Sequence, residues 1–180
     1  RDGDRKDVEP VIQVLAELAL FDELDEILVG RRNETDVDAQ RSFRADRIDL
    51  ALTYDYDLAP AALDPDLAAT PLWTTAWGLA VPAAEAPVGS ADSLAVVSAF
   101  RDRAWIGNSR NPADEQVLRT LASMAGFALR TTHEADSLDL VEDLILAGLG
   151  VGLLPHDRPT APGIAIVPLT APAVRLRASA

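Results

Sequence analysis

The stretch that decides the fold is residues 105–116, which read WIGNSRNPADEQ. An apolar strand ends there at a polar tip, and a helix begins directly after it. Asn111 suits the N-cap of that helix because its side-chain oxygen can accept a free backbone N–H. Pro112 suits the first helical position, and Asp114 and Glu115 place negative charge at the positive end of the helix dipole. Such a junction points backbone donors beyond the carboxyl end of a strand, where open α/β sheets bind ligands.

The same strand-to-helix corner is predicted at residues 33–35 and 135–137, where Thr35 and either Asp136 or Ser137 suit the N-cap. A fourth polar tip, residues 54–56, ends an apolar strand without an obvious helix after it. If these tips converge, they form a polar pocket that has helix N-termini and aromatic walls.

Strands and helices alternate along the chain, which predicts an α/β sheet architecture. Apolar runs predict strands at 26–30, 48–54, 72–81 (one strand or a pair), 104–107, 128–133, 148–154, 164–169 and 174–177. Helical spacing and caps predict helices at 8–19, over about ten residues after Thr35, and at 94–100, 112–125 and 137–147. Gly126 is expected to stop the fourth of these helices, and Trp105 is expected in the core.

The composition excludes several classes of function. The 180 residues carry a net charge of −13 with a pI near 4.4, so the chain by itself is not expected to bind DNA. No cysteine is present, which excludes disulfides and thiolate metal sites and fits a cytoplasmic protein. No apolar run reaches the length of a membrane span, and no serine is positioned with His133 as in a hydrolase. We therefore expect no catalytic residues, metal or cofactor.

Three segments carry a resemblance to a known family: IDLALTY at 48–54, WGLAVP at 77–82, and AGLGVGLLP at 147–155 after Leu140-Val141. In combination they resemble the effector-binding domain of LysR-type transcriptional regulators, in register over roughly residues 10–180. The glycines of the third segment follow a helix and enter a strand, so they are read as a helix C-cap and tight turn and not as a dinucleotide loop.

The resemblance implies an α/β fold of two Rossmann-like lobes joined by crossover strands, similar to type 2 periplasmic binding proteins. Lobe I is expected at 1–74 with a return strand at 174–180, and lobe II at 75–173. Relative to the family pattern the termini are truncated: the helix-turn-helix, the first strand and the closing helix are not recognisable. The chain is therefore expected to be a fragment of a regulator.

The resemblance also places an effector site between the lobes. Its positions fall here on Asn33, Thr35, Tyr54, Asp55, Asn108, Ser109, Arg110 and, less closely, Thr132. Arg110 is the best candidate to bind a carboxylate, because a guanidinium offers two parallel donors. Plainer roles stay open for these and neighbouring residues: the 108–111 corner as a capped helix start, Arg110 as an ion-pair partner of Asp114 or Glu115, and Tyr54, Tyr56 and Trp77 as packing residues.

The function implied is an effector-sensing regulatory domain of a LysR-type transcription factor, whose ligand is a small metabolite, with anions among the candidates. The family resemblance implies a homodimer or tetramer, with helices 10–19 and 112–125 as candidate contacts. It implies DNA binding only through a separate helix-turn-helix domain, no membrane partner, and a cytoplasmic location. The alternatives are a solute-binding module of a transport system and an enzyme that reuses the fold.

Overall fold

A computed structural model describes residues 52–62, 68–89 and 92–180. The helix at 8–19, the strand at 26–30, most of the strand at 48–54 and the predicted contacts Asn33 and Thr35 lie outside the described residues.

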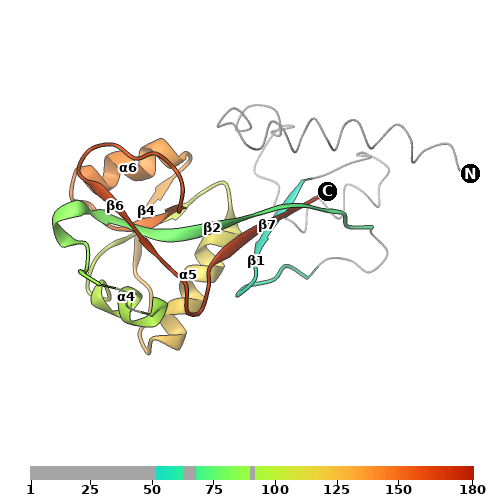
Figure 1. Cartoon of the computed structure of the whole chain (residues 1–180), viewed down its shortest axis with the longest axis horizontal. Helices are drawn as coiled ribbons and strands as arrows, with labels where there is room; N and C mark the ends of the chain where they lie inside the picture. The colour runs from blue at the N-terminus through green and yellow to red at the C-terminus, as the bar shows by residue number, and fades with distance from the viewer. Residues whose placement is uncertain (1–51, 63–67, 90–91) are drawn as a thin grey trace, which may run out of the picture. The chain divides into compact units, whose positions relative to one another are not determined.

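The described residues form strands and helices in alternation (Figure 1). The strands are β1 (Thr53–Tyr56), β2 (Pro71–Pro82), β3 (Trp105–Asn108), β4 (Thr131–Ala135), β5 (Gly152–Pro155), β6 (Ile164–Pro168) and β7 (Arg175–Ser179). The helices are α4 (Ser93–Ala99), α5 (Pro112–Met124), α6 (Leu138–Leu146) and a short 3₁₀ helix (Ala83–Glu85).

The elements predicted within the described residues are present, with differences at their ends. The segment 72–81 is part of one long strand, β2, and Ser137 caps α6 by accepting the N–H of Leu140. The strand predicted at 128–133 begins three residues later. Gly126 has a φ of 79° and the N–H of Phe127 donates to the carbonyl of Ala122, so these residues close the end of α5 and cannot extend β4.

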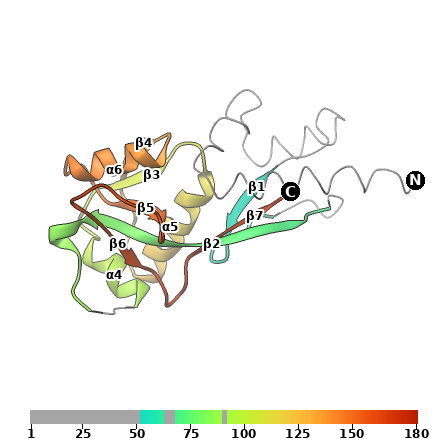
Figure 2. The same ribbon diagram turned by 45° about the horizontal axis from the view of Figure 1, so that its top comes forward.

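Strand β2 organises the sheets. It pairs antiparallel with β5 through Trp77–Ala80 and with β6 through Gly78–Pro82, and one sheet has the order β1-β7-β2-β5 with β6 beside β2. Strands β3 and β4 pair in parallel, and Ile106 also donates its N–H to Val151 just before β5. Figures 1 and 2 show α6 on one side of β2 and α4 on the other.

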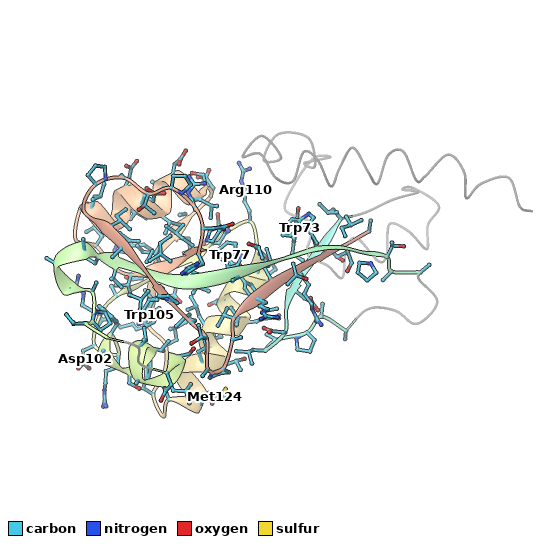
Figure 3. All side chains as sticks on the ribbon, viewed as in Figure 1. Trp73, Trp77, Asp102, Trp105, Arg110 and Met124 are labelled. Atoms are coloured by element: carbon cyan, nitrogen blue, oxygen red, sulfur yellow. The ribbon has the colours of Figure 1, made fainter. Side chains whose placement is uncertain are left out.

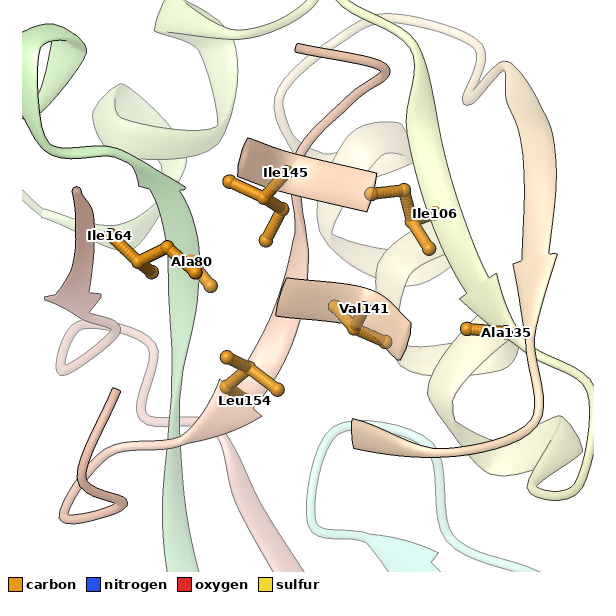
Figure 4. Packing of buried hydrophobic residues seen from close by; sticks show 7 residues of the cluster. All are labelled: Ala80, Ile106, Ala135, Val141, Ile145, Leu154 and Ile164. Carbon is orange, nitrogen blue, oxygen red and sulfur yellow. The ribbon is translucent and has the colours of Figure 1, made fainter. Parts of the chain in front are cut away.

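The core under α6 follows from alternation along the strands. Seven buried residues make up this cluster (Figure 4): Ala80, Ile106, Ala135, Val141, Ile145, Leu154 and Ile164. Leu79, Trp105 and Leu153, next to three of them in sequence, are also buried and face the opposite side of their strands. Trp105 is fully buried, as predicted.

Two local contacts hold the rim of this core together. Gly78 lies so close to β6 that an added Cβ would be 2.5 Å from a side-chain methyl of Ile166. On α6, Glu142 is only 7% exposed and accepts bonds from Arg158 Nε (3.0 Å) and the Ala161 N–H (2.9 Å). This ion pair ties the loop between β5 and β6 to α6.

The chain divides into two compact units. Unit 1 comprises residues 1–53, 62–73 and 177–180, and unit 2 comprises 54–61 and 74–176. In unit 1, Thr70 and Ala180 exchange backbone hydrogen bonds of 2.7 and 3.0 Å. The chain passes from one unit to the other within β1, β2 and β7.

Candidate functional site

The turn between β3 and α5, residues 108–111, is called here the β3–α5 corner. Asn111 is the N-cap of α5, and its Oδ1 accepts the N–H of Ala113 at 3.2 Å, as predicted. The N–H and the hydroxyl of Ser109 both donate to the carbonyl of Ala135, at 2.8 and 3.1 Å. The corner at 135–137 therefore lies directly beside the β3–α5 corner in unit 2.

Four backbone N–H groups of the β3–α5 corner and of the first turn of α5 have acceptors inside the protein. Arg110 donates its N–H to Asn108 Oδ1 at 3.0 Å, and Asp114 donates its N–H to the Asn111 carbonyl at 3.1 Å. The other two are the N–H groups of Ser109 and Ala113. The expectation of unpaired donors is wrong for these four groups, because the asparagine side chains, the Asn111 carbonyl and the neighbouring strand satisfy them.

The strand tip at 54–56 reaches this corner through a buried pair. The hydroxyl of Tyr56 donates to Asp114 Oδ1 at 2.7 Å, across 58 positions of sequence. Asn111 Nδ2 donates to the same oxygen at 2.9 Å. The side chain of Asn108 favours the charged form of this carboxyl group. Tyr56 is fully buried and Asp114 is 3% exposed, so the pair is shielded from water.

The surroundings set the ionisation of both partners. Burial raises the pKa of Asp114 from 3.8 to about 6, although the hydrogen bonds from Tyr56 and Asn108 act in the opposite direction. Burial, and secondarily the charge of Asp114, raise the pKa of Tyr56 well above 10.0, so the phenol stays protonated and acts as the donor.

Trp77 packs against this pair. Its ring lies edge-on to that of Tyr56, with 5.9 Å between centroids and 80° between planes. Trp77 is 5% exposed and lies on β2 (Figure 3). An aromatic contact therefore joins the buried phenol to the long strand.

The predicted site residues lie in different places. Tyr54 and Asp55 are half-buried beside Tyr56, and Asp55 Oδ2 accepts the N–H of Ala61 at 2.9 Å. Arg110 is exposed, and Figure 3 shows its side chain extending outward from the β3–α5 corner.

The two carboxylates considered as ion-pair partners of Arg110 have other partners in the structure. Asp114 is bonded to Tyr56 and Asn111, and Glu115 is paired with Arg119 at 2.7 Å. Both carboxylates therefore have partners other than Arg110.

Thr132 lies on β4, away from the capped end of α5. It lines an open hollow of about 440 Å³ whose walls come from the outer side of α5 and from β4. The lining residues are Glu115, Arg119, Leu129, Arg130, Thr131, Thr132, His133 and Glu134. None of the hydrogen bonds of the described residues joins Thr132 to the β3–α5 corner.

The sequence did not predict the contact between two residues of the site. Tyr56 is interpreted there as a pocket wall or a packing residue, and Asp114 as a favourable charge at a helix start or an ion-pair partner of Arg110. A signal for Asp114 exists: it precedes Val117, Leu118 and Leu121 by three, four and seven positions, which is the spacing of one helix face. All three are buried, and Asp114 lies on the same face.

Within residues 52–62, 68–89 and 92–180, no three histidine, aspartate or glutamate side chains gather in a way that could hold a metal ion. None of the helices described in these ranges is long and apolar enough to cross a membrane.

Comparison with known proteins identifies the family. The pattern described as the LysR substrate binding domain matches residues 32–180, and no curated protein sequence matches the chain. Among solved structures, the C-terminal domain of a probable LysR family transcriptional regulator from Rhodococcus sp. RHA1 is 19% identical. That match covers 94% of this chain and 82% of that one, with a TM-score of 0.61.

Two further structures share the fold. The Synechocystis PCC6803 CcmR regulatory domain, solved in complex with 2-PG, is 13% identical, with 97% of this chain and 82% of that chain covered and a TM-score of 0.61. CbnR, a LysR family transcriptional regulator, is 17% identical over 82% of this chain, with a TM-score of 0.56. The chain spans 51% of the length of CbnR. The fold is thus the type 2 periplasmic-binding-protein-like α/β fold that the resemblance implied, and the chain belongs to the LysR substrate binding domain family.

Proposed function

We propose that the chain is the effector-sensing domain of a LysR-type transcription factor and binds a small organic molecule at the β3–α5 corner. The observation that carries this proposal is the convergence of three polar strand tips in unit 2. Tyr56 reaches Asp114 over 2.7 Å, and Ser109 bonds to Ala135 over 2.8 Å. These contacts bring the carboxyl ends of β1, β3 and β4 together, which is where sheets of this class bind ligands.

The corner supports recognition by side chains. The backbone N–H groups of Ser109 and Arg110 have protein acceptors, so we expect an anion to be recognised chiefly by the exposed guanidinium of Arg110, with Asn108 and Ser109 beside it. Asn33, Thr35, Tyr54, Asp55 and Thr132 remain predicted contacts.

The output of such a domain is a change in DNA binding by a separate helix-turn-helix domain. The net charge of −13 supports this division of labour, because a chain this acidic repels phosphate backbones. The effector can act only through a difference in its affinity for two arrangements of the predicted lobes, 1–74 with 174–180 and 75–173.

We also propose that the protein is cytoplasmic, acts without catalysis, and forms a homodimer or tetramer in which α5 takes part. The family is a regulatory one, which favours these assignments over an enzyme or a transport module. Light scattering on the purified chain would test the oligomeric state, and a monomer at all concentrations would contradict it.

The experiment for ligand binding is isothermal titration with small carboxylates and phosphates, with 2-PG included. Arg110→Ala should weaken binding of a confirmed anion by about 10- to 100-fold, because a hydrogen-bonded charge pair is lost. Arg119→Ala is the matched control, since it removes another exposed arginine of the same region, already paired with Glu115. Equal affinity of the Arg110→Ala variant and the unmodified chain would show that the anion binds elsewhere.

A further inference from the structure

We propose that Asp114 is a positioning residue for ligand recognition: its buried carboxylate holds the β3–α5 corner in shape, and loss of its charge rearranges the groups that face the ligand. This inference deepens the proposed function, since it treats the corner as the place where the ligand binds. It concerns a residue that contacts Asn108 and Asn111 and acts through them.

The first step of the argument is the set of donors around one carboxyl group. Tyr56 and Asn111 both donate to Asp114 Oδ1, at 2.7 and 2.9 Å. The side chain of Asn108 also favours the charged form of Asp114. Two neutral donors therefore converge on one oxygen of Asp114, an arrangement suited to a carboxylate, which only accepts.

The second step is the connection from this carboxylate to the outer side of the corner. Asn111 bonds Asp114 through Nδ2 and the Ala113 N–H through Oδ1, so one amide joins the carboxylate to the first turn of α5. Asn108, whose side chain favours the charged form of Asp114, accepts the Arg110 N–H at 3.0 Å. The two asparagines thus connect the surroundings of Asp114 to the backbone at Ala113 and Arg110.

The third step is the effect of a proton. A protonated carboxyl group loses its negative charge and gains an O–H donor. The bonds from Tyr56 and Asn111 then become weaker because their acceptor is no longer charged, and the new O–H needs an acceptor of its own. Because burial raises the pKa of Asp114 to about 6, mild acid is enough to protonate this carboxylate.

Few titratable groups surround Asp114 and affect its protonation. Tyr56 from β1 is the titratable side chain in contact with Asp114, while β3 and α4, which pack against α5, have no charged residue. On α5 itself, Glu115 is bonded to Arg119 on the outer side, and Arg110 is exposed. The proton equilibrium therefore belongs mainly to Asp114 and its donors.

Tyr56 gives this group a second connection. The chain enters unit 2 at Tyr54, two residues before Tyr56, within β1. The bond from Tyr56 to Asp114 therefore attaches the entering strand to the same carboxylate that orients the corner. A rearrangement around Asp114 therefore changes both the attachment of β1 and the β3–α5 corner.

The test is a pH titration of the ¹⁵N-labelled chain from pH 8 to pH 4.5, followed by amide NMR and without any ligand. We expect the backbone amides of Ser109 and Arg110 and the side-chain amides of Asn108 and Asn111 to shift with one common midpoint. Asp114→Asn should abolish this shared transition. Glu115→Gln is the matched control, because it removes the adjacent carboxylate of the same helix, and it should leave the transition in place.

Tyr56→Phe keeps the inference testable if Asp114→Asn does not fold. It removes a donor that stabilises the charged carboxylate, so the midpoint should move upward by about 0.5–1 pH unit. A midpoint unchanged in Tyr56→Phe, or corner amides that still titrate together in Asp114→Asn, would overturn the inference. Since no ligand is used, these results stand apart from the titrations that test the proposed function.

Discussion

The buried charge of Asp114 gives a sharp prediction about stability and pH. Its pKa rises from 3.8 to about 6 on folding, a change of about 2 units, and each unit corresponds to about 1.4 kcal/mol. Because the folded chain holds this proton more tightly than the unfolded chain, the contribution of Asp114 to stability falls as the pH rises between these two values. Above pH 6 the whole penalty, on the order of 3 kcal/mol, is present.

Asp114→Asn removes this penalty together with its pH dependence. The free energy of unfolding of the variant, minus that of the unmodified chain, should therefore increase by about 2–3 kcal/mol from pH 4 to pH 7. The absolute difference at one pH is less informative, because the amide also lacks the negative charge that strengthens the bonds from Tyr56 and Asn111.

The assay is urea unfolding followed by fluorescence and circular dichroism at pH 4, 5, 6 and 7. The other acidic groups are common to both chains and cancel in the difference. Glu115→Gln serves again as the control and should give a nearly constant difference over this range. If Asp114→Asn also gives a constant difference, or one that decreases with pH, the hydrogen bonds outweigh desolvation and the reasoning is refuted.

Three further substitutions test the packing around the site. Tyr56→Phe should lower the free energy of unfolding at pH 7 by about 1–3 kcal/mol, because Asp114 loses a buried donor, and by less at pH 4. Arg158→Ala should lower it by about 3 kcal/mol, since Glu142 keeps its charge in a buried place. Gly78→Ala should lower it by about 1–3 kcal/mol, because the new methyl would lie 2.5 Å from a side chain of β6. All three are measured by urea unfolding.

Two of these substitutions have a specific contrary outcome. A Tyr56→Phe loss that is equal at both pH values would separate the phenol from the charge of Asp114. Arg119→Ala breaks an exposed ion pair and should change stability by less than about 1 kcal/mol. If Arg158→Ala has no larger effect than that control, the pair with Glu142 contributes no more than a surface pair.

Helix α5 shows what the sequence could predict. Its start was predicted from Asn111 and Pro112, and its end from Gly126, because caps and glycine turns depend on neighbouring residues alone. The start of β4 was predicted too early, at 128. The turn after Gly126 uses Phe127 to close the helix, and the ladder with β3 begins at Thr131, opposite Trp105.

The candidate site was only partly predictable for a related reason. Asn108 and Ser109 were identified because they lie at a strand end, which is a local feature. The roles of Tyr56 and Asp114 depend on two segments 58 positions apart meeting at a buried point. A single acidic residue in a first helical turn is ordinarily a solvated charge, so only its place on the face of Val117 and Leu118 marks it as unusual.

The hydrogen bonding of the backbone at the β3–α5 corner has a consequence for how such a domain can diversify. Because the N–H groups of Ser109, Arg110, Ala113 and Asp114 have acceptors inside the protein, a ligand at the proposed site would be selected mainly by side chains. A duplicated gene could then acquire a different effector through a few codon changes at exposed positions. The backbone of the corner would keep its geometry while the ligand that the domain recognises changes.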